Sequence, residues 1–300
     1  MDKITIHAMA KINLGLDVLR RRENGYHDVK MIMQTVDLYD RLSFQKKKKP
    51  GISLSTDHEM VPCDESNLVY KAAALMAEKY DIKEGIHITL EKHIPIAAGM
   101  AGGSTDAAAA FVGINRLFDL KAETEDLKKL AVTIGADVPY CIEGGTALSE
   151  GIGEILSPLP APPFCYLVIA KPGISVSTAY VYGNLHVETL EHHPDIDGMT
   201  EAIQNGDLEK MCSLMENVLE RVTKAKYPVI GDLESILQEK GAIKSMMSGS
   251  GPTVFGIFNE KEKAEAALEA MKETGYCEQC VLTTFAKEAQ VVVEEMEDNN

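Results

Sequence analysis

Apolar and polar residues alternate with great regularity along the first stretch of the chain. Every second residue from Ile4 to Val18 is apolar, and the polar positions between them include Thr5, His7, Lys11, Asn13 and Asp17. A period of two predicts a β-strand with one buried face. Lys11 and Asn13 should then project together from the opposite face. Asn24-Gly25 predicts a tight turn into a following strand.

The remaining pattern mixes helical and extended segments without regular alternation of the two. Apolar residues at helical spacing predict helices at about 66–80, 106–118, 123–134, 199–221, 231–240 and 260–274. Short apolar runs predict strands at 86–90, 164–170 and 253–258. Two loops rich in small residues, 95–105 and 247–252, precede a helix and a strand respectively. This mixture predicts an α+β fold.

The chain length favours two domains over one. A chain of 300 residues is long for a single compact domain. The proline-rich segment from Pro158 to Pro163 is the best candidate for a linker. We therefore predict an N-terminal domain over residues 1–157 and a C-terminal domain over residues 164–292. The acidic end, Glu294 to Asn300, is expected to fray.

Composition and charge narrow the classes of function. The net charge is −16, and the basic residues form no stripe, so a nucleic-acid partner is not expected. The lysine run at 46–49 lies beside Pro50-Gly51 and is typical of a solvated turn. No apolar run is long enough to span a membrane, and the N-terminus lacks a signal peptide, which favours the cytoplasm. The pattern specifies no oligomeric state.

The six cysteines are scattered along the chain. Cys277 and Cys280 form a single CxxC without the second ligand pair that a structural zinc site needs. We interpret them as free thiols.

The loop at 95–105 is the sharpest chemical feature. Small residues allow the backbone to approach a ligand closely, and the start of the following helix offers unpaired N–H groups and the positive end of a dipole. Together these features predict a phosphate-binding loop. The loop lacks the Gly-Lys-Ser/Thr end of a Walker motif and the GxGxxG of a dinucleotide fold. The alternative is a flexible connector before a tightly packed helix.

Three further positions carry candidate chemistry. Lys11 is either a solvated strand residue or part of a site that includes Asn13. Asp137 follows the helix-ending Gly135, and it is either a turn aspartate that binds nearby N–H groups or a carboxylate that accepts a proton from a hydroxyl. Tyr26 and His27 follow the turn directly. They could bind a heteroaromatic ring or could be surface residues.

Taken together, these motifs resemble the GHMP kinase superfamily. The phosphate loop resembles the family's pattern through Pro95, Gly99 and Gly103-Ser104, and the C-terminal glycine motif through residues 248–253. Within the family, four segments resemble a branch whose substrate is a cytidine diphosphate derivative of methylerythritol, used in isoprenoid synthesis: Ala10 to Leu16, Asn24 to Val29, Gly135 to Pro139, and Lys171 to Gly173 with Ser177-Thr178. The resemblance extends from residue 4 to about residue 258.

The resemblance implies a fold, a reaction and a set of site residues. It implies a two-domain GHMP kinase fold, with an N-terminal domain like ribosomal protein S5 and a ferredoxin-like C-terminal domain, and it implies ATP and Mg²⁺. Asp137 would be the general base for the C2 hydroxyl of the substrate, and Lys11 would keep it ionised and steady the transferred phosphoryl group. Asn13, Tyr26, His27 and Tyr182 would bind the substrate, with cytosine stacked between the two tyrosines.

The ATP phosphates would be bound by the whole loop, namely Pro95, Ile96, Ala97, Ala98, Gly99, Met100, Ala101, Gly102, Gly103, Ser104 and Thr105. Ala97, Ala98 and Ala101 stand where many relatives carry glycine. Alanine suits such a loop if its φ is negative. Ser104 is the candidate in this loop for a contact with Mg²⁺.

Two other functions remain open on the sequence. One is a GHMP kinase that acts on homoserine or mevalonate, although such substrates have no base to stack on Tyr26. The other is a relative without catalysis that binds a ligand, although Lys11 and Asp137 are both retained.

Overall fold

A computed structural model describes residues 2–293, and these residues build two β-sheets. Within this range the larger sheet has seven strands, with neighbours in the order β11–β1–β2–β4–β3 and with β5 and β6 branching from β2. Its strands are β1 (Lys3–Arg21), β2 (His27–Lys47), β3 (Ile52–Thr56), β4 (Gly85–Glu91), β5 (Thr146–Gly151), β6 (Ile155–Leu159) and β11 (Gln290–Val293). All pairs are antiparallel except β3–β4.

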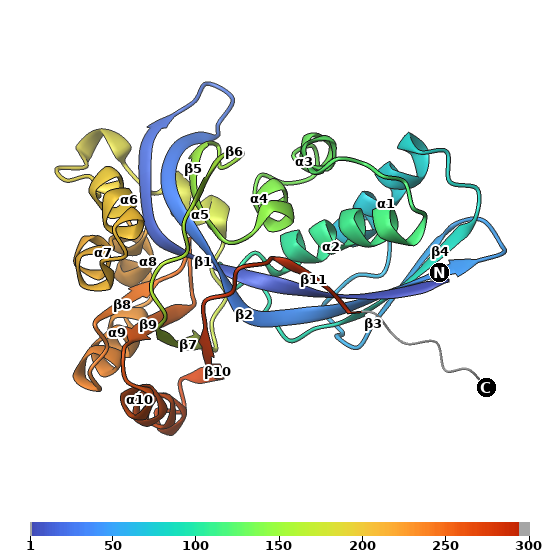
Figure 1. Ribbon diagram of the computed structural model, residues 1–300. Helices are drawn as coiled ribbons and strands as arrows, with labels where there is room; N and C mark the ends of the chain where they lie inside the picture. Colours follow the sequence, from blue (N-terminus) through green and yellow to red (C-terminus); the bar gives the residue numbers. More distant parts are fainter. Residues whose placement is uncertain (1, 294–300) are drawn as a thin grey trace.

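One face of this sheet is covered by a layer of helices (Figure 1). They are α1 (Leu68–Lys79), α2 (Gly102–Leu117), α3 (Thr124–Ala131) and α4 (Val138–Glu143). The central helix, α2, packs closely on β1 and β2 because its buried face is made largely of alanine, from Ala107 to Ala110. Small side chains let a helix axis approach its neighbour, and here they bring the start of α2 over the bend in β1.

The smaller sheet contains four antiparallel strands among the described residues, in the order β10–β7–β9–β8. They are β7 (Tyr166–Pro172), β8 (Lys244–Met247), β9 (Val254–Phe258) and β10 (Cys277–Thr284), and α9 (Val229–Glu239) and α10 (Lys261–Glu273) pack on them. This order and connection give the ferredoxin-like arrangement that the family resemblance implies. The shorter segments α5 (Thr178–Gly183), η1 (Val187–Thr189), α6 (Ile196–Gln204), α7 (Leu208–Leu214) and α8 (Glu220–Lys226) join β7 to α9.

The expectation that β1 has a single buried face is wrong. Lys11, Asn13 and Asp17 are as buried as the apolar residues between them. The reason is that β1 lies between layers: α2 covers it on one side, while α6 and the loop after β8 pack near its second half. Irregular pairing with β2 at Met9/Ala10 and Asn13/Gly15 brackets Lys11 and Asn13. Such bulges redirect side chains and are common beside active sites.

The predicted elements are largely present, with two differences of extent. The helical region at 199–221 is divided among α6, α7 and the start of α8. The phosphate loop is shorter than expected, because Gly102 already begins α2. All six cysteines are free thiols in this structure.

The predicted domain limits, 1–157 and 164–292, stay a prediction. β6 continues to Leu159, and β11 pairs with β1 of the first sheet although it lies at the end of the second range. This pairing covers an edge of β1 that would otherwise be exposed. The acidic end, 294–300, lies outside the described residues. No helix in residues 2–293 is long and apolar enough to cross a membrane.

The contact between α2 and the sheet yields a test of packing. A Cβ at Gly113 would lie 2.7 Å from ring atoms of Phe44, which is fully buried. Gly113→Ala should lower the free energy of unfolding by up to about 2 kcal/mol, because overpacking costs about 1–3 kcal/mol and the gain in helix propensity offsets only about 1 kcal/mol of that. Urea unfolding measures the change.

Gly231→Ala is the matched control. Gly231 also lies within a helix, α9, but no neighbouring atom lies within 4 Å of the position that an added methyl group would take. This substitution should raise the free energy of unfolding by about 0.5–1 kcal/mol. If Gly113→Ala stabilised the protein equally, α2 would not be held as closely to Phe44 as described.

Candidate active site

A cavity of about 850 Å³ lies between the helices on the larger sheet and the loop that follows β8. Its lining comes from parts of the chain that are far apart in sequence: β1 and β2, the segment 60–68, the loop 95–104, Asp137, α5 and the loop at 249–250. The size suits a small organic ligand, and several polar groups converge on it. The cavity is therefore the candidate active site, and the position of each predicted site residue is described relative to it.

The phosphate loop forms one wall of the cavity. Of the eleven residues expected to bind ATP, nine line it: Pro95, Ile96, Ala97, Ala98, Gly99, Ala101, Gly102, Gly103 and Ser104. Met100 is instead buried in an apolar cluster, and the Thr105 hydroxyl accepts a hydrogen bond from Gln290 at 2.8 Å. No side chain caps the start of α2, so its first N–H groups and the positive end of its dipole are available to an anion.

The backbone of this loop is strained. The φ angles are +52° at Ala97 and +57° at Ala101, so the condition that alanine has a negative φ is not met at these two positions. Gly99 between them also has a positive φ, +73°. An alanine in this left-handed region costs about 1–2 kcal/mol. The surrounding structure must therefore hold the loop in place.

The second glycine loop, residues 247–252, closes against the first. A Cβ at Gly99 would lie 2.3 Å from the carbonyl oxygen of Ser248, so only glycine allows this approach. The Ser248 hydroxyl donates to the carbonyl of Gly99 at 3.0 Å and accepts from the N–H of Asn13 at 3.3 Å. Ser248, Gly249 and Ser250 were not among the predicted site residues, although their Ser-Gly-Ser-Gly pattern was a visible signal.

Lys11 and Asp137 come together at the centre of the cavity. The Lys11 ammonium lies 3.8 Å from Asp137 Oδ2, donates to Asn13 Oδ1 at 2.7 Å and reaches the carbonyl of Gly99 at 3.4 Å. The side chain of Lys11 is only 6% exposed, whereas that of Asp137 is 34% exposed. The carboxylate thus faces the cavity with a buried cation behind it, and a solvated role for Lys11 is excluded.

The local setting of Asp137 does not fit a turn aspartate. It stands at the N-cap position of α4, yet its side chain makes no capping hydrogen bond. This carboxylate lies beside a lysine, is open to the cavity and makes no capping hydrogen bond. It can therefore accept a proton from a bound hydroxyl.

Aromatic residues form another part of the lining. The rings of His27 and Tyr182 lie 5.2 Å apart between centroids and are tilted by 40°, while Tyr26 is 57% exposed. Burial, and then the charge of Arg21, lower the pKa of His27. The imidazole is therefore neutral near pH 7 and offers one donor and one acceptor. Such a group can read the hydrogen-bonding edge of a base.

The geometry defines a class of protein. A helix start suited to phosphate and a lysine–carboxylate pair in one cavity are the parts that phosphoryl transfer to a hydroxyl requires. Two family descriptions match the chain: "GHMP kinases N terminal domain" over residues 67–145 and "GHMP kinases C terminal" over residues 199–277. The chain belongs to the GHMP kinase family, and as a kinase it uses ATP as co-substrate.

Particular relatives are similar over nearly the whole chain. The chain is 50% identical to the 4-diphosphocytidyl-2-C-methyl-D-erythritol kinase of Lachnoclostridium phytofermentans, over 97% of this chain and 100% of the relative. It is 52% identical to the protein of the same name from Lachnospira eligens, over 94% and 98% of the two chains.

Solved structures agree with this relationship. A crystal structure of 4-(cytidine 5'-diphospho)-2C-methyl-D-erythritol kinase is 31% identical, with a TM-score of 0.80 over 94% of this chain and 99% of the other. A homoserine kinase from Cytophaga hutchinsonii reaches a TM-score of 0.81 at 23% identity, over 98% of both chains, which shows a shared fold.

The contact between the two glycine loops can be tested at Gly99. Gly99→Ala adds a methyl group that meets the carbonyl of Ser248 and strains a positive φ. The loops must then separate, and we expect the KM for ATP to rise about tenfold or more, since 1.4 kcal/mol is a factor of ten. Steady-state kinetics measure the KM.

Gly206→Ala is the control for strain alone. Gly206 has a similar φ, +66°, but no atom lies within 4 Å of a Cβ there. This variant should lose about 1 kcal/mol of stability and keep its KM for ATP. An unchanged KM in Gly99→Ala would mean that the contact between the loops does not shape the nucleotide site.

Proposed function

We propose that this kinase transfers the γ-phosphoryl group of ATP to the C2 hydroxyl of 4-diphosphocytidyl-2-C-methyl-D-erythritol, a reaction of isoprenoid synthesis. The observation that carries the proposal is the Lys11–Asp137 pair, which shares its cavity with both the phosphate loop and the aromatic residues. The printed names of relatives about 50% identical to the chain support the same substrate.

Asp137 is the general base in this proposal. Its carboxylate accepts the proton of the C2 hydroxyl while that oxygen bonds to the γ-phosphorus and the bond to the ADP oxygen breaks. The buried Lys11 keeps a positive charge next to this carboxylate and toward the transferring group. Because phosphoryl transfer depends chiefly on position and charge, the pair and the loop form a sufficient set.

The loop 95–104 and the start of α2 bind the phosphates of ATP. The unpaired N–H groups of the helix start and the nearby Lys11 supply the positive potential. The nucleoside end of ATP then lies toward Met60, Asn67 and Leu68, because Tyr26, His27 and Tyr182 serve the other nucleoside.

Mg²⁺ fits these residues as a companion of the ATP phosphates. Among the described residues no group of three or more His, Cys, Asp or Glu side chains could hold a metal by itself. Mg²⁺ usually takes one or two protein oxygens together with phosphates and water. The Ser104 hydroxyl, in the first turn of α2, is a protein oxygen in the lining that could serve as such a ligand. When bound, the ion neutralises charge on the phosphates.

Asn13, Tyr26, His27 and Tyr182 bind the substrate. Tyr26 and Tyr182 stack on the cytosine ring, and the neutral His27 pairs with its polar edge. The Asn13 amide donates to Met31 and its carbonyl oxygen accepts from Lys11, so its orientation is fixed beside the reacting groups. Homoserine and mevalonate have no ring for these residues to bind, which favours the cytidine substrate.

Replacement of the general base gives a direct test of the mechanism. Asp137→Asn keeps the size of the side chain but removes the proton acceptor. We expect kcat to fall by about 10²–10⁴, the usual contribution of a general base, with little change in the KM for ATP. Coupled release of ADP measures the rate. A kcat near that of the wild type would remove Asp137 from this role.

The substrate is tested by a panel and one variant. Release of ADP should be saturable with the cytidine substrate and absent with homoserine, mevalonate and galactose. Tyr26→Ala should raise the KM for the cytidine substrate about 10- to 100-fold, because stacking on a base contributes about 1–3 kcal/mol, and should leave the KM for ATP within about twofold.

Tyr276→Ala is the matched control, since Tyr276 is also exposed but does not line the cavity. Turnover of another alcohol in the panel, or an equal rise of both KM values in Tyr26→Ala, would overturn the proposed substrate site.

A further inference from the structure

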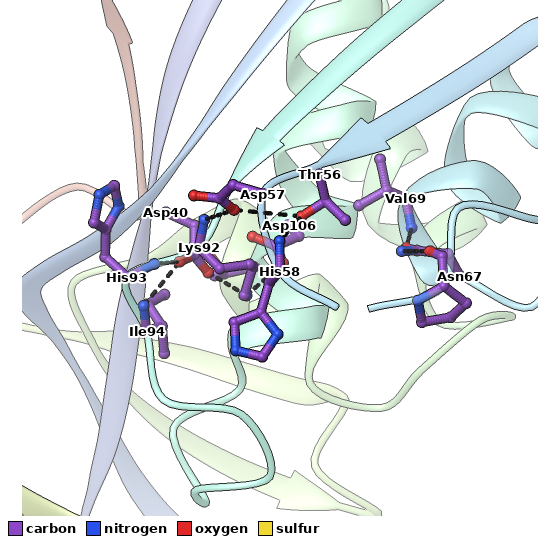
Figure 2. A network of polar contacts seen from close by, with 12 residues as sticks. Asp40, Thr56, Asp57, His58, Asn67, Val69, Lys92, His93, Ile94 and Asp106 are labelled. Carbon is purple, nitrogen blue, oxygen red and sulfur yellow. Dashed lines mark hydrogen bonds and ion pairs between the residues drawn. The ribbon is translucent and has the colours of Figure 1, made fainter. Parts of the chain in front are cut away.

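A buried cluster of three charged side chains, Asp40, Lys92 and Asp106, lies next to Ile94, just before the phosphate loop (Figure 2). The Lys92 ammonium donates to a carboxylate oxygen of Asp40 on β2 and to Asp106 Oδ2 on α2, the latter at 2.8 Å. Their side chains are 5%, 0% and 4% exposed for Lys92, Asp40 and Asp106. Lys92 and Asp106 line the cavity, but almost none of their side-chain surface is exposed, so solvent screens these contacts little.

The cluster is joined to both ends of the loop. Before the loop, Asp40 Oδ1 accepts hydrogen bonds from the N–H groups of His93 and Ile94 at 2.6 and 2.8 Å, so Asp40 holds the chain that leads into Pro95. After the loop, Asp106 belongs to the second turn of α2, and Lys92 binds it. Residues 95–101 are thus spanned by one network of hydrogen bonds (Figure 2).

The two ends of the loop 95–101 lie close together. A Cβ at Gly102, the first residue of α2, would lie 3.2 Å from a methyl group of Ile94 and 3.3 Å from the Lys92 ammonium. The helix start therefore rests directly on the cluster. Between these two ends, Ala97 and Ala101 have φ values of +52° and +57°. Strained backbone persists only where its surroundings fix it.

The charge of the cluster is compatible with a neighbouring polyanion. Burial raises the pKa of Asp106 well above its usual range, against the opposing attraction of Lys92. The charges of Asp106 and Asp40 more than offset the effect of burial on Lys92, whose pKa is raised. Asp106 Oδ1 has no hydrogen-bond partner among the described residues.

We propose that Asp40, Lys92 and Asp106 act as positioning residues that clamp both ends of the loop 95–101 and so hold its strained, anion-ready conformation before a nucleotide arrives. They are distinct from Lys11 and Asp137 and, although Lys92 and Asp106 line the same cavity, they are not expected to touch the transferred group. The consequence for ATP rests on the proposed function of the loop, whereas the conformation of the loop itself does not.

Asp106→Ala is the variant that cuts the clamp with the least disturbance, because it leaves Lys92 paired with Asp40. In the protein without nucleotide, we expect amide hydrogen exchange across residues 96–104 to become at least about tenfold faster. The KM for ATP should rise about 10- to 100-fold while kcat changes less than about threefold. Asp106→Asn keeps a side-chain oxygen that can accept the hydrogen bond from Lys92, so both quantities should stay near those of the wild type.

A substitution that relieves the backbone strain at Ala101 can distinguish a clamp on the loop from a general contribution to the stability of the fold. Glycine adopts a positive φ without steric cost, so Ala101→Gly reduces the need for a clamp. Added to Asp106→Ala, it should recover about three- to tenfold of the lost affinity for ATP, measured relative to Ala101→Gly alone. A variant that merely loosened the fold would gain nothing from this second substitution.

Glu143→Ala supplies the matched control. Glu143 also binds a lysine, Lys128, at 2.8 Å and so joins two helices of the same layer, but neither residue lines the cavity. Its loss should leave exchange in 96–104 and the KM for ATP unchanged. Unchanged exchange in Asp106→Ala, or no recovery with Ala101→Gly, would overturn the clamp. Faster exchange in 96–104 with an unchanged KM for ATP would uphold the clamp and instead refute the assignment of this loop to ATP.

Discussion

The active site depends on a close backbone contact between two loops of small residues. The loop before α2 and the loop after β8 belong to segments about 150 residues apart, and they meet where Gly99 lies against the carbonyl of Ser248. Any side chain at residue 99 would separate them. Because Asn13 donates to the same Ser248 hydroxyl, this contact also fixes the bend of β1 that carries Lys11. One steric constraint thereby sets the distance between the phosphate loop and the reacting pair.

Two buried lysines on either side of that contact have different surroundings. Lys92 lies between two carboxylates with almost no exposed surface, so its charge is compensated inside the protein. Lys11 has one carboxylate partner at 3.8 Å, and that carboxylate is open to the cavity. A buried ammonium that is only partly neutralised favours an incoming anion, whereas a compensated one serves to hold elements together. The same residue type can thus supply either reactivity or rigidity, according to its partners.

The backbone strain at Ala97 and Ala101 is consistent with a rigidifying role for the Lys92 cluster. A glycine-only loop would reach the same conformation without steric cost, but it would be more flexible before the ligand binds. Alanine restricts the loop, and the surrounding network must then hold it in the left-handed region. The result is a preorganised anion site, in which part of the cost of ordering is met during folding and not during binding.

Much of this protein followed from the sequence alone. The period of two in residues 4–18, the helical spacing after the small-residue loop and the order of the later segments predicted the strands, most helices and the α+β class, because local periodicity reflects which face is buried. The family motifs indicated the GHMP fold and the candidates Lys11, Asp137, Tyr26 and His27. Each of these motifs is contiguous in the sequence, and therefore it can be recognised without a structure.

The tertiary structure decided what depends on contacts between distant segments. The alternation in β1 could not reveal that both faces are buried, because a polar residue under a second layer looks the same in sequence as one in water. Met100 and Thr105 could not be separated from the cavity-lining residues of their loop, since a turn sends neighbours in opposite directions. Nothing in the spacing of Asp40, Lys92 and Asp106 predicts their meeting. Their partners are set by how α2 packs on the sheet, and packing is a property of the whole fold.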